Sequence, residues 1–321
     1  MKKKFNVFKL HFKSGFHSSA GGFGNEDIDL CIHSDTLFSA VCSCANLIYG
    51  SSGVEKLINT KELIISSTFP FIKGEYYLPI PAFFLPSNFD QIEYKYQKKF
   101  KKVRFVEKSL FGQIVKGSKP PFDQTEDHHV VLQNCWRSRD TLETERYYSE
   151  IEHPRVTLDR ITNESTVFYF SEFRFAEDAG LYFIADWGDK DDLNMIFTAS
   201  LRLLGDEGIG CDRNVGKGKF VVEKEFIVLD IPENSDHQMV LSLYSPTQPE
   251  LDYIDFGASF FDIIVRQGWT GTALRRKSLR MIGEGSVLKT GTGICGTTHR
   301  VLENPPVFRY GKTLVLPVVI N

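Results

Sequence analysis

The fold is decided by the stretch Leu203-Leu-Gly-Asp-Glu-Gly-Ile-Gly-Cys-Asp-Arg-Asn-Val-Gly-Lys-Gly-Lys-Phe220, in which five glycines fall within fourteen residues. The residues before it predict a helix, because apolar side chains from Leu193 to Leu204 recur at steps of three and four residues. The residues after it, Phe220 to Leu229, are typical of a strand. One glycine is enough to end a helix. Five glycines therefore predict a loop with a role of its own.

The glycine loop has two possible roles. Glycine allows positive φ and the close approach of another backbone, and successive N–H groups turned the same way form a concavity for anions. Arg213, Lys217 and Lys219 add positive charge. These features predict a cradle for a phosphate backbone. The alternative is a flexible surface connection with ordinary basic residues, and the local pattern leaves both open.

Two named nucleotide motifs are excluded. A Walker A loop has four residues between its glycines and then Lys-Ser or Lys-Thr, whereas Gly210 and Gly216 have five between them and Gly218 replaces the hydroxyl residue. The segment Gly291–Gly296 fits G-x-G-x-x-G, but the residues after it do not form a convincing helix. We therefore interpret that match as accidental.

Length and composition narrow the class of protein. With 321 residues the chain predicts two domains, and 27 Phe with 12 Tyr favour sheets. The net charge of −3 means that any nucleic-acid binding must come from local patches. The six cysteines form no C-x-x-C and match no zinc spacing, which indicates reduced thiols of a cytoplasmic protein without a metal or other cofactor. No apolar run approaches the roughly 20 residues of a membrane span.

A first helix is predicted to begin at Ser34 or Asp35 and to end between Gly50 and Gly53. His33 then stands at its N-terminus, where free N–H groups attract anions. His33 could contact a phosphate or act as an acid–base group. The alternative is an ordinary polar loop residue.

Two features follow this helix. The apolar runs 63–71 and 76–84 predict a hairpin turned at Lys73-Gly74, with the prolines of the second run placing it at an edge of the sheet or past the sheet. Residues 95–119 then carry nine Lys and Arg, one acid, and interleaved phenylalanines. This segment is either a mobile arm for nucleic acid or a solvated insertion anchored by its phenylalanines.

The order of predicted elements gives the fold class. A second hairpin is predicted from 167–175 and 181–187, so the order becomes strand, helix, hairpin, helix, strand, which is the ferredoxin-like arrangement. We predict an α+β protein with a first domain over 1–232, carrying a basic insertion at about 87–153. A mostly β second domain spans 236–321, with a second basic cluster around its own glycine segment.

Several motifs together resemble a known family. These are Ile32-His-Ser-Asp-Thr-Leu-Phe-Ser-Ala40, Val156-Thr-Leu-Asp-Arg160, Ala179-Gly-Leu-Tyr-Phe183, the glycine loop and Phe308-Arg-Tyr-Gly-Lys312. In this order they resemble the RAMP subunits of type III CRISPR effector complexes, and most closely the fourth subunit of the type III-A Csm complex. Cys211 departs from the pattern, because the family more often has a small, Gly-like residue there.

The resemblance implies two ferredoxin-like, RNA-recognition-type (RRM-like) domains. It implies a noncatalytic subunit that grips the 5′ repeat-derived handle of the CRISPR RNA and contacts the large polymerase-like Cas subunit and the repeating backbone RAMP subunit. Carried over to this sequence, it places the first helix start, Arg160 and the second glycine segment near the glycine loop. The predicted RNA-binding residues are His33, Ser34, Asp35, Arg160, Gly208, Gly210, Arg213, Gly216, Lys217, Gly218, Lys219, Arg275, Arg276, Lys277, Lys289, Gly291 and Gly293.

Two other functions stay open from the sequence. The first is a CRISPR-RNA-processing endoribonuclease of the RAMP type, in which His33 would supply acid–base chemistry with Lys13 or Lys217 opposite. The second is an interaction module that binds neighbouring subunits without touching RNA.

Overall fold

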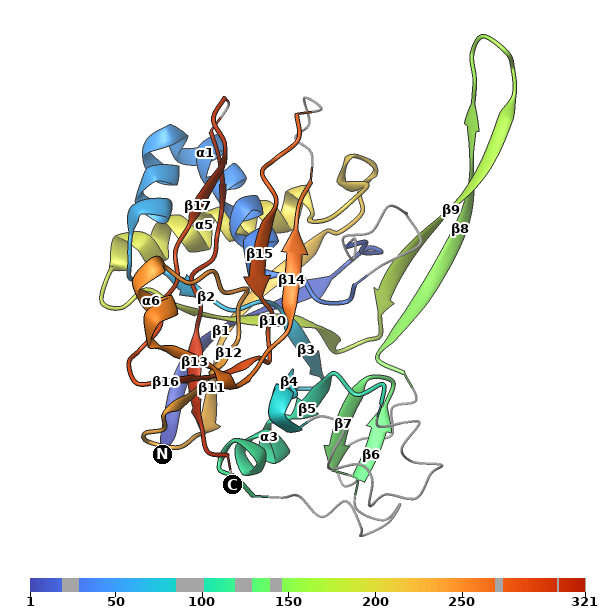
Figure 1. The fold of residues 1–321 in the computed structure, drawn as a ribbon. Coiled ribbons are helices and arrows are strands. Elements are labelled where there is room, and N and C mark those ends of the chain that lie inside the picture. Colours follow the sequence, from blue (N-terminus) through green and yellow to red (C-terminus); the bar gives the residue numbers. More distant parts are fainter. Residues whose placement is uncertain are drawn as a thin grey trace.

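The structure is a computed structural model that describes residues 1–18, 29–84, 101–118, 129–138, 146–268, 274–304 and 306–320. Within these residues the class is α+β, as predicted, with extensive sheets and few helices (Figure 1). One large sheet forms the centre, two long helices cover one of its faces, and a long hairpin projects from its side.

The large sheet has nine strands in the described residues, in the order β11-β1-β10-β3-β4-β5-β7-β6, with β2 also paired to β10. Strand β1 is second in this order, and both of its faces are covered around Phe8 and Lys9. Phe8 stacks on Phe183 on one face, and on the other the buried Lys9 lies 2.8 Å from Glu225. The strands are β1 (Lys2–Phe12), β2 (Ile64–Ile65), β3 (Phe69–Ile72), β4 (Glu75–Pro79), β5 (Phe105–Glu107), β6 (His129–Leu132), β7 (Cys135–Ser138), β10 (Ala179–Asp186) and β11 (Phe220–Asp230).

The two long helices, α1 (Ser34–Asn59) and α5 (Asp191–Glu207), pack against each other. The helix was predicted to end between Gly50 and Gly53, and its regular geometry does break at Gly50, but the element does not end there. Gly50 adopts φ 66° and kinks the helix, which then continues to Asn59 because Leu57 is buried in the core. By length and composition alone α1 could cross a membrane. Its apolar residues from Leu37 to Ala45 instead belong to the hydrophobic core.

The sequence left two interpretations of the basic segment 95–119, a mobile arm and an anchored insertion. Residues 95–100 and 119 lie outside the described residues. The rest forms β5 and helix α3 (Lys108–Val115), with Phe105 and Phe111 buried. Strand β4 pairs with β3 on one side and with β5 on the other, and β5 pairs in turn with β7. The prolines of β4 had suggested a place at or past the sheet edge, and this pairing shows that β4 lies inside the sheet. The anchored interpretation therefore holds for this part.

A long two-stranded hairpin, β8 (Tyr148–Leu158) and β9 (Ser165–Phe175), extends away from the body of the molecule (Figure 1). The predicted pairing of 167–175 with 181–187 is wrong, because β9 pairs with β8 while β10 pairs with β1, β2 and β3. The base of the hairpin touches the body, among other contacts through the bridge between Phe16 and Phe173.

The C-terminal region is mostly β in its described residues and holds one helix, α6 (Gln248–Tyr253), with a capping box from Thr247 and Glu250. Part of it shares a core with the large sheet, since Leu241 and Tyr310 belong to the same apolar cluster as β1. Its strands are β12 (His237–Val240), β13 (Ile254–Phe260), β14 (Ile263–Arg266), β15 (Leu279–Ile282), β16 (Val287–Thr290), β17 (His299–Leu302), β18 (Val307–Arg309) and β19 (Val315–Val318).

Candidate nucleic-acid interface

The glycine loop joins α5 to β11, and three of its glycines, Gly208, Gly210 and Gly218, are required by close backbone packing. Gly208, Gly210 and Gly218 have positive φ of 84°, 91° and 70°. A Cβ on Gly210 would lie 2.1 Å from the carbonyl oxygen of His17, and one on Gly218 would lie 1.9 Å from that of Ile209. The loop is thus a packed structure against the segment after β1, and the alternative of a loose connection does not hold.

The expected concavity of free N–H groups is not formed by most of this loop. Most backbone N–H groups of the loop donate to carbonyl oxygens of the protein itself, and one donates to the hydroxyl of Ser14. Gly218 N donates to the oxygen of Gly15 at 2.8 Å, and Cys211 N donates to that of His17 at 3.0 Å. The other bonded amides are those of Gly208, Ile209, Val215, Gly216, Lys217 and Lys219. Anion binding here must therefore come mainly from side chains.

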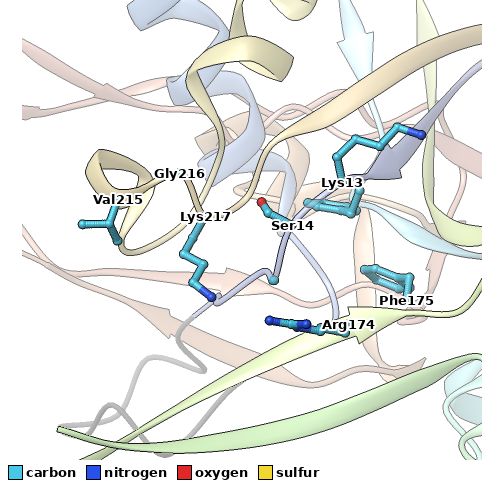
Figure 2. Close-up of a pocket in the computed structure, with 9 residues that line it drawn as sticks. Lys13, Ser14, Arg174, Phe175, Val215, Gly216 and Lys217 are labelled. Carbon is cyan, nitrogen blue, oxygen red and sulfur yellow. The ribbon is translucent and has the colours of Figure 1, made fainter.

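A hollow of about 400 Å³ lies beside the glycine loop (Figure 2). It is lined by the start of the loop after β1, the end of β9 and the residues Val215–Lys217. Phe12 and Phe175 form an aromatic wall, with ring centroids 5.2 Å apart. Figure 2 shows Lys217 and Arg174 reaching toward the same space, while Lys13 extends away from them.

Several cations in or beside the glycine loop have no carboxylate partner among the described residues. Lys13, Arg213 and Lys219 are exposed, and no ion pair holds any of them within that part of the chain. Lys13 N also donates to the carbonyl oxygen of Lys219 at 2.8 Å, so the two lysines lie on adjacent backbone. These side chains are available to an anionic ligand.

A buried carboxylate lies behind the hollow. The Glu172 side chain on β9 is fully buried, and its carboxylate is 2.5 Å from Lys217 Nζ, 3.0 Å from Arg174 Nε and 3.3 Å from His153 Nε2. Burial raises the pKa of Glu172, but hydrogen bonds from Lys217, Arg174 and His153 outweigh it and leave the pKa below its usual value. The carboxylate is therefore ionised at neutral pH.

A second ion pair joins the hairpin to the glycine loop. Arg155 on β8 lies 2.5 Å from Asp212 and 4.1 Å from the centroid of the Phe170 ring. His17 also stacks on Phe170 and donates from Nδ1 to the carbonyl oxygen of Ser171 at 2.6 Å. The base of the hairpin and the glycine loop are thus connected at two points.

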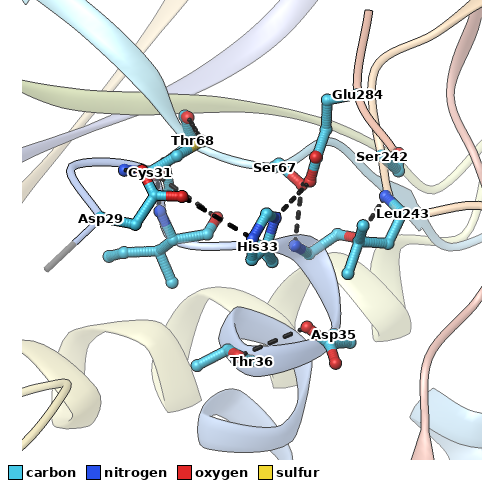
Figure 3. Close-up of polar contacts among 12 residues, drawn as sticks. Asp29, Cys31, His33, Asp35, Thr36, Ser67, Thr68, Ser242, Leu243 and Glu284 are labelled. Carbon is cyan, nitrogen blue, oxygen red and sulfur yellow. Dashed lines mark hydrogen bonds and ion pairs between the residues drawn. The ribbon is translucent and has the colours of Figure 1, made fainter. Parts of the chain in front are cut away.

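His33 and its neighbours lie in a separate network between the N-terminal and C-terminal regions (Figure 3). His33 is the residue before α1, its Nδ1 is 2.8 Å from Glu284, and its Nε2 is 3.9 Å from Asp29. Burial lowers the pKa of His33, but the charge of Glu284 outweighs it and raises the pKa above its usual value. Ser34 accepts a hydrogen bond from Leu243 N at 3.0 Å.

Asp35 is also engaged within the protein. Its buried carboxylate accepts two hydrogen bonds from Arg266, both at 3.0 Å, and a third from Arg309. Such a bidentate pair fixes geometry as well as charge. The predicted residues at the start of α1 therefore connect two regions of the chain, and an RNA contact by them stays a prediction.

The other predicted site residues are dispersed. Arg160 is exposed in the turn of the β8–β9 hairpin, about 17 Å along the strand from Arg155 at the usual rise per residue. Gly291 and Gly293 are exposed in the segment after β16, which lies beside α6, since Glu250 accepts hydrogen bonds from the amides of Cys295 and Gly296. Lys289 Nζ is 3.9 Å from Asp255. Arg275 and Lys277 are exposed, and Arg276 is partly buried near Gly268.

Sequence reasoning missed several residues of the hollow. Arg174, Phe175 and Ser14 line it, and Glu172 and Arg155 support it. The only signal in the sequence was the basic residue two positions after Glu172 on a predicted strand, which places both on one face. In the described residues no group of three or more His, Cys, Asp or Glu could hold a metal ion.

Comparison with known families identifies the class. The family model for the RAMP superfamily matches residues 9–221, so the chain belongs to the RAMP superfamily. A second family model, the CRISPR Csm4 C-terminal domain, matches residues 233–318. The resemblance seen in the sequence is thus confirmed.

Individual relatives agree with this assignment. The chain is 29% identical over 293 residues to the "CRISPR system Cms protein Csm4" of Thermococcus onnurineus (strain NA1), covering 88% of this chain and 90% of the relative. The Methanocaldococcus jannaschii protein of the same description is 25% identical, over 79% of this chain and 77% of the relative. A chain of the crystal structure of the Csm1-Csm4 cassette in complex with cA4 matches with TM-score 0.67 and 25% identity over 99% of both chains. A chain of the Csm3-Csm4 subcomplex of a type III-A interference complex has the same fold, with TM-score 0.67 and 19% identity, over 99% of this chain and 100% of that chain.

Proposed function

We propose that this chain is the Csm4-type subunit of a type III-A CRISPR interference complex. In this proposal it is a noncatalytic cytoplasmic protein without a cofactor that grips the 5′ repeat-derived handle of the CRISPR RNA. It docks the large polymerase-like subunit and the repeating backbone RAMP subunit. The relatives named Csm4, and the structures in which such a subunit is accompanied by Csm1 or Csm3, support the assembly role.

The observation that carries the RNA-binding role is the hollow beside the glycine loop. It combines an aromatic wall of Phe12 and Phe175 with the cations Lys217 and Arg174, and the glycine loop beside it carries exposed cations that have no carboxylate partner in the described residues. Proteins hold single-stranded RNA by cationic contacts to its backbone and by stacking on aromatic side chains. A chain with a net charge of −3 concentrates its binding in such a local site.

We also propose the finer fold and domain assignment. The strand order β11-β1-β10-β3 with helices α1 and α5 supports a ferredoxin-like arrangement for the domain over 1–232. The two family matches, which end at 221 and begin at 233, support a boundary near the predicted linker at 232–236. A ferredoxin-like arrangement of the second domain, 236–321, stays a prediction.

One observation weighs against the endoribonuclease alternative. Both ring nitrogens of His33 face carboxylates, and the side chain is mostly buried. A general acid or base must reach the proton that it transfers, and this arrangement directs His33 toward Glu284 and Asp29.

The test is co-expression of the chain with its genomic neighbours, purification of the assembly, ultraviolet crosslinking and sequencing of the bound RNA. We expect a protected RNA with a repeat-derived 5′ end, crosslinked to residues 213–219 or to Phe175. Recovery of the assembly with RNA crosslinked only to other subunits would support the interaction module instead. Metal-independent cleavage of labelled repeat RNA by the wild type that is lost in His33→Ala would contradict the noncatalytic assignment.

A further inference from the structure

The buried carboxylate of Glu172 has a geometry that the proposed function does not require. An RNA-binding site gains nothing directly from a negative charge, because the charge repels phosphate. Yet this fully buried carboxylate lies 2.5 Å from Lys217 and 3.0 Å from Arg174, the two cations that reach into the hollow. Its presence therefore calls for a different role.

The space for Glu172 is built into the backbone. Gly15, in the segment after β1, has no side chain, and a Cβ there would lie 2.2 Å from the carboxyl carbon of Glu172. The carbonyl oxygen of Gly15 accepts the amide of Gly218 at 2.8 Å. One glycine thus gives room to the carboxylate and holds the glycine loop in place.

The contacts of the carboxylate come from three separate parts of the chain. Lys217 belongs to the glycine loop, Arg174 to β9, and His153 to β8. Lysine has a flexible four-carbon chain that loses rotamer entropy when it is held in one conformation. A buried anion that orders Lys217 before RNA arrives removes that cost from binding.

We propose that Glu172 is a positioning residue of the RNA-binding site: it holds Lys217 and Arg174 at the hollow so that both cations face a phosphodiester of single-stranded RNA. It does not contact RNA itself. The inference rests on the proposed RNA-binding function, and it makes a prediction of opposite sign to simple electrostatics. Loss of the negative charge should weaken RNA binding, although it makes the site more positive.

The first experiment needs no RNA. Acetylation of Lys217 by acetic anhydride is followed by mass spectrometry in the free protein, in Glu172→Gln and in Glu177→Gln. Glu177 is an exposed carboxylate just after β9 and serves as the matched control. We expect Lys217 to react faster in E172Q and at the wild-type rate in E177Q. Equal rates in all three proteins would overturn the inference, whether or not the protein binds RNA.

The second experiment measures the affinity for a fluorescein-labelled RNA of the repeat-derived 5′ sequence. Loss of a positioned charge-assisted contact should weaken binding about tenfold in E172Q. Lys217→Met should show a similar loss, and the loss in the double variant should be smaller than the sum of the two single losses, because Glu172 acts in part through Lys217. Tighter binding by E172Q would show that Glu172 acts only through its charge, and additive losses would show that it does not act through Lys217. Either result would overturn the proposal.

A second variant guards against misfolding of E172Q. Gly15→Ala leaves every charge in place and pushes a methyl group against the carboxylate. We expect G15A to raise the acetylation of Lys217 and to weaken RNA binding as E172Q does. An unchanged affinity in G15A, together with an unchanged Lys217 reactivity, would contradict the positioning role. If wild-type protein fails to bind the RNA while the acetylation pattern holds, the proposed function fails and the geometric role of Glu172 stands.

Discussion

His33 Nδ1 lies 2.8 Å from Glu284 Oε1, although 251 residues separate the two in sequence. Ser67 also donates its hydroxyl to Glu284, and its own oxygen accepts the amide of Ser34 at 2.8 Å. The start of α1 is therefore connected to the segment after β15 by a mostly buried charged network. Breaking a buried ion pair costs far more than breaking an exposed one, because the remaining charge has no partner.

The first prediction concerns the pH dependence of this pair. Burial disfavours the charged form of both residues, but the charge of the partner outweighs burial in each case. The pKa of His33 is therefore raised and the pKa of Glu284 is lowered. The contribution of protonated His33 to the free energy of unfolding is fully present below its unfolded pKa of about 6.5, and it is lost as the pH rises through the raised pKa of the folded state. The contribution of Glu284 is present above about pH 4.3 and is lost as pH falls through its folded pKa.

We therefore expect the loss of unfolding free energy in Glu284→Gln to be largest between about pH 4.5 and 6.5, at about 2–3 kcal/mol, and smaller at pH 8.5. Urea unfolding of both proteins across this pH range measures it. His237→Gln is the control, because His237 pairs with the exposed Asp236, and it should change stability by less than about 1 kcal/mol. A loss in E284Q that does not vary with pH would contradict the charged state of the pair.

The second prediction concerns Asp35. Asp35→Asn removes the negative charge between Arg266 and Arg309 and leaves two mostly buried guanidinium groups without their carboxylate. We expect a loss of about 3–5 kcal/mol in the free energy of unfolding, measured by urea denaturation. Asp206→Asn, an exposed carboxylate on α5, should be nearly neutral. A neutral D35N would show that the network contributes little to joining the two regions.

The elements of the N-terminal region were largely predictable, and their pairing was not. The period of apolar residues identified α5, β11 and the hairpin of β3 with β4. The same pattern did not reveal that β9 pairs with β8, because alternation gives the face of a strand and not its partner. Strand β8 was largely missed, since Pro154 and several charged residues make it resemble a turn.

The site was predictable only in its backbone. The spacing of glycines located the loop and Lys217 beside it, because positive φ restricts the residue type strongly. Glu172 and Glu284 were not identified, since a buried paired carboxylate and a solvated one look the same in a sequence. Gly50 also shows the limit, because a glycine that ends one helix only kinks another when the next turn has apolar residues to bury.

The third prediction separates two glycines of the loop. A Cβ at Gly218 would lie 1.9 Å from the carbonyl oxygen of Ile209, whereas a Cβ at Gly216 meets open space. Gly216→Ala should therefore cost only the left-handed backbone, about 1–2 kcal/mol. Gly218→Ala must move backbone and should cost about 3 kcal/mol or more. Thermal or urea unfolding measures both, and equal losses would mean that the loop is less tightly packed than the structure indicates.

The fourth prediction concerns the salt dependence of RNA binding. Lys13 and Lys219 are exposed, lack carboxylate partners in the described part of the chain, and lie on adjacent backbone beside the hollow. If both contact phosphates, Lys13→Gln with Lys219→Gln should reduce the slope of log K against log salt by about 1.4, since each phosphate contact of a single strand contributes about 0.7. Titration of labelled single-stranded RNA at several salt concentrations measures the slope. The control is Lys190→Gln, because Lys190 precedes α5 and lies at the opposite end of that helix from the glycine loop. The control should keep the wild-type slope. An unchanged slope in the double variant would place the RNA backbone elsewhere on the molecule.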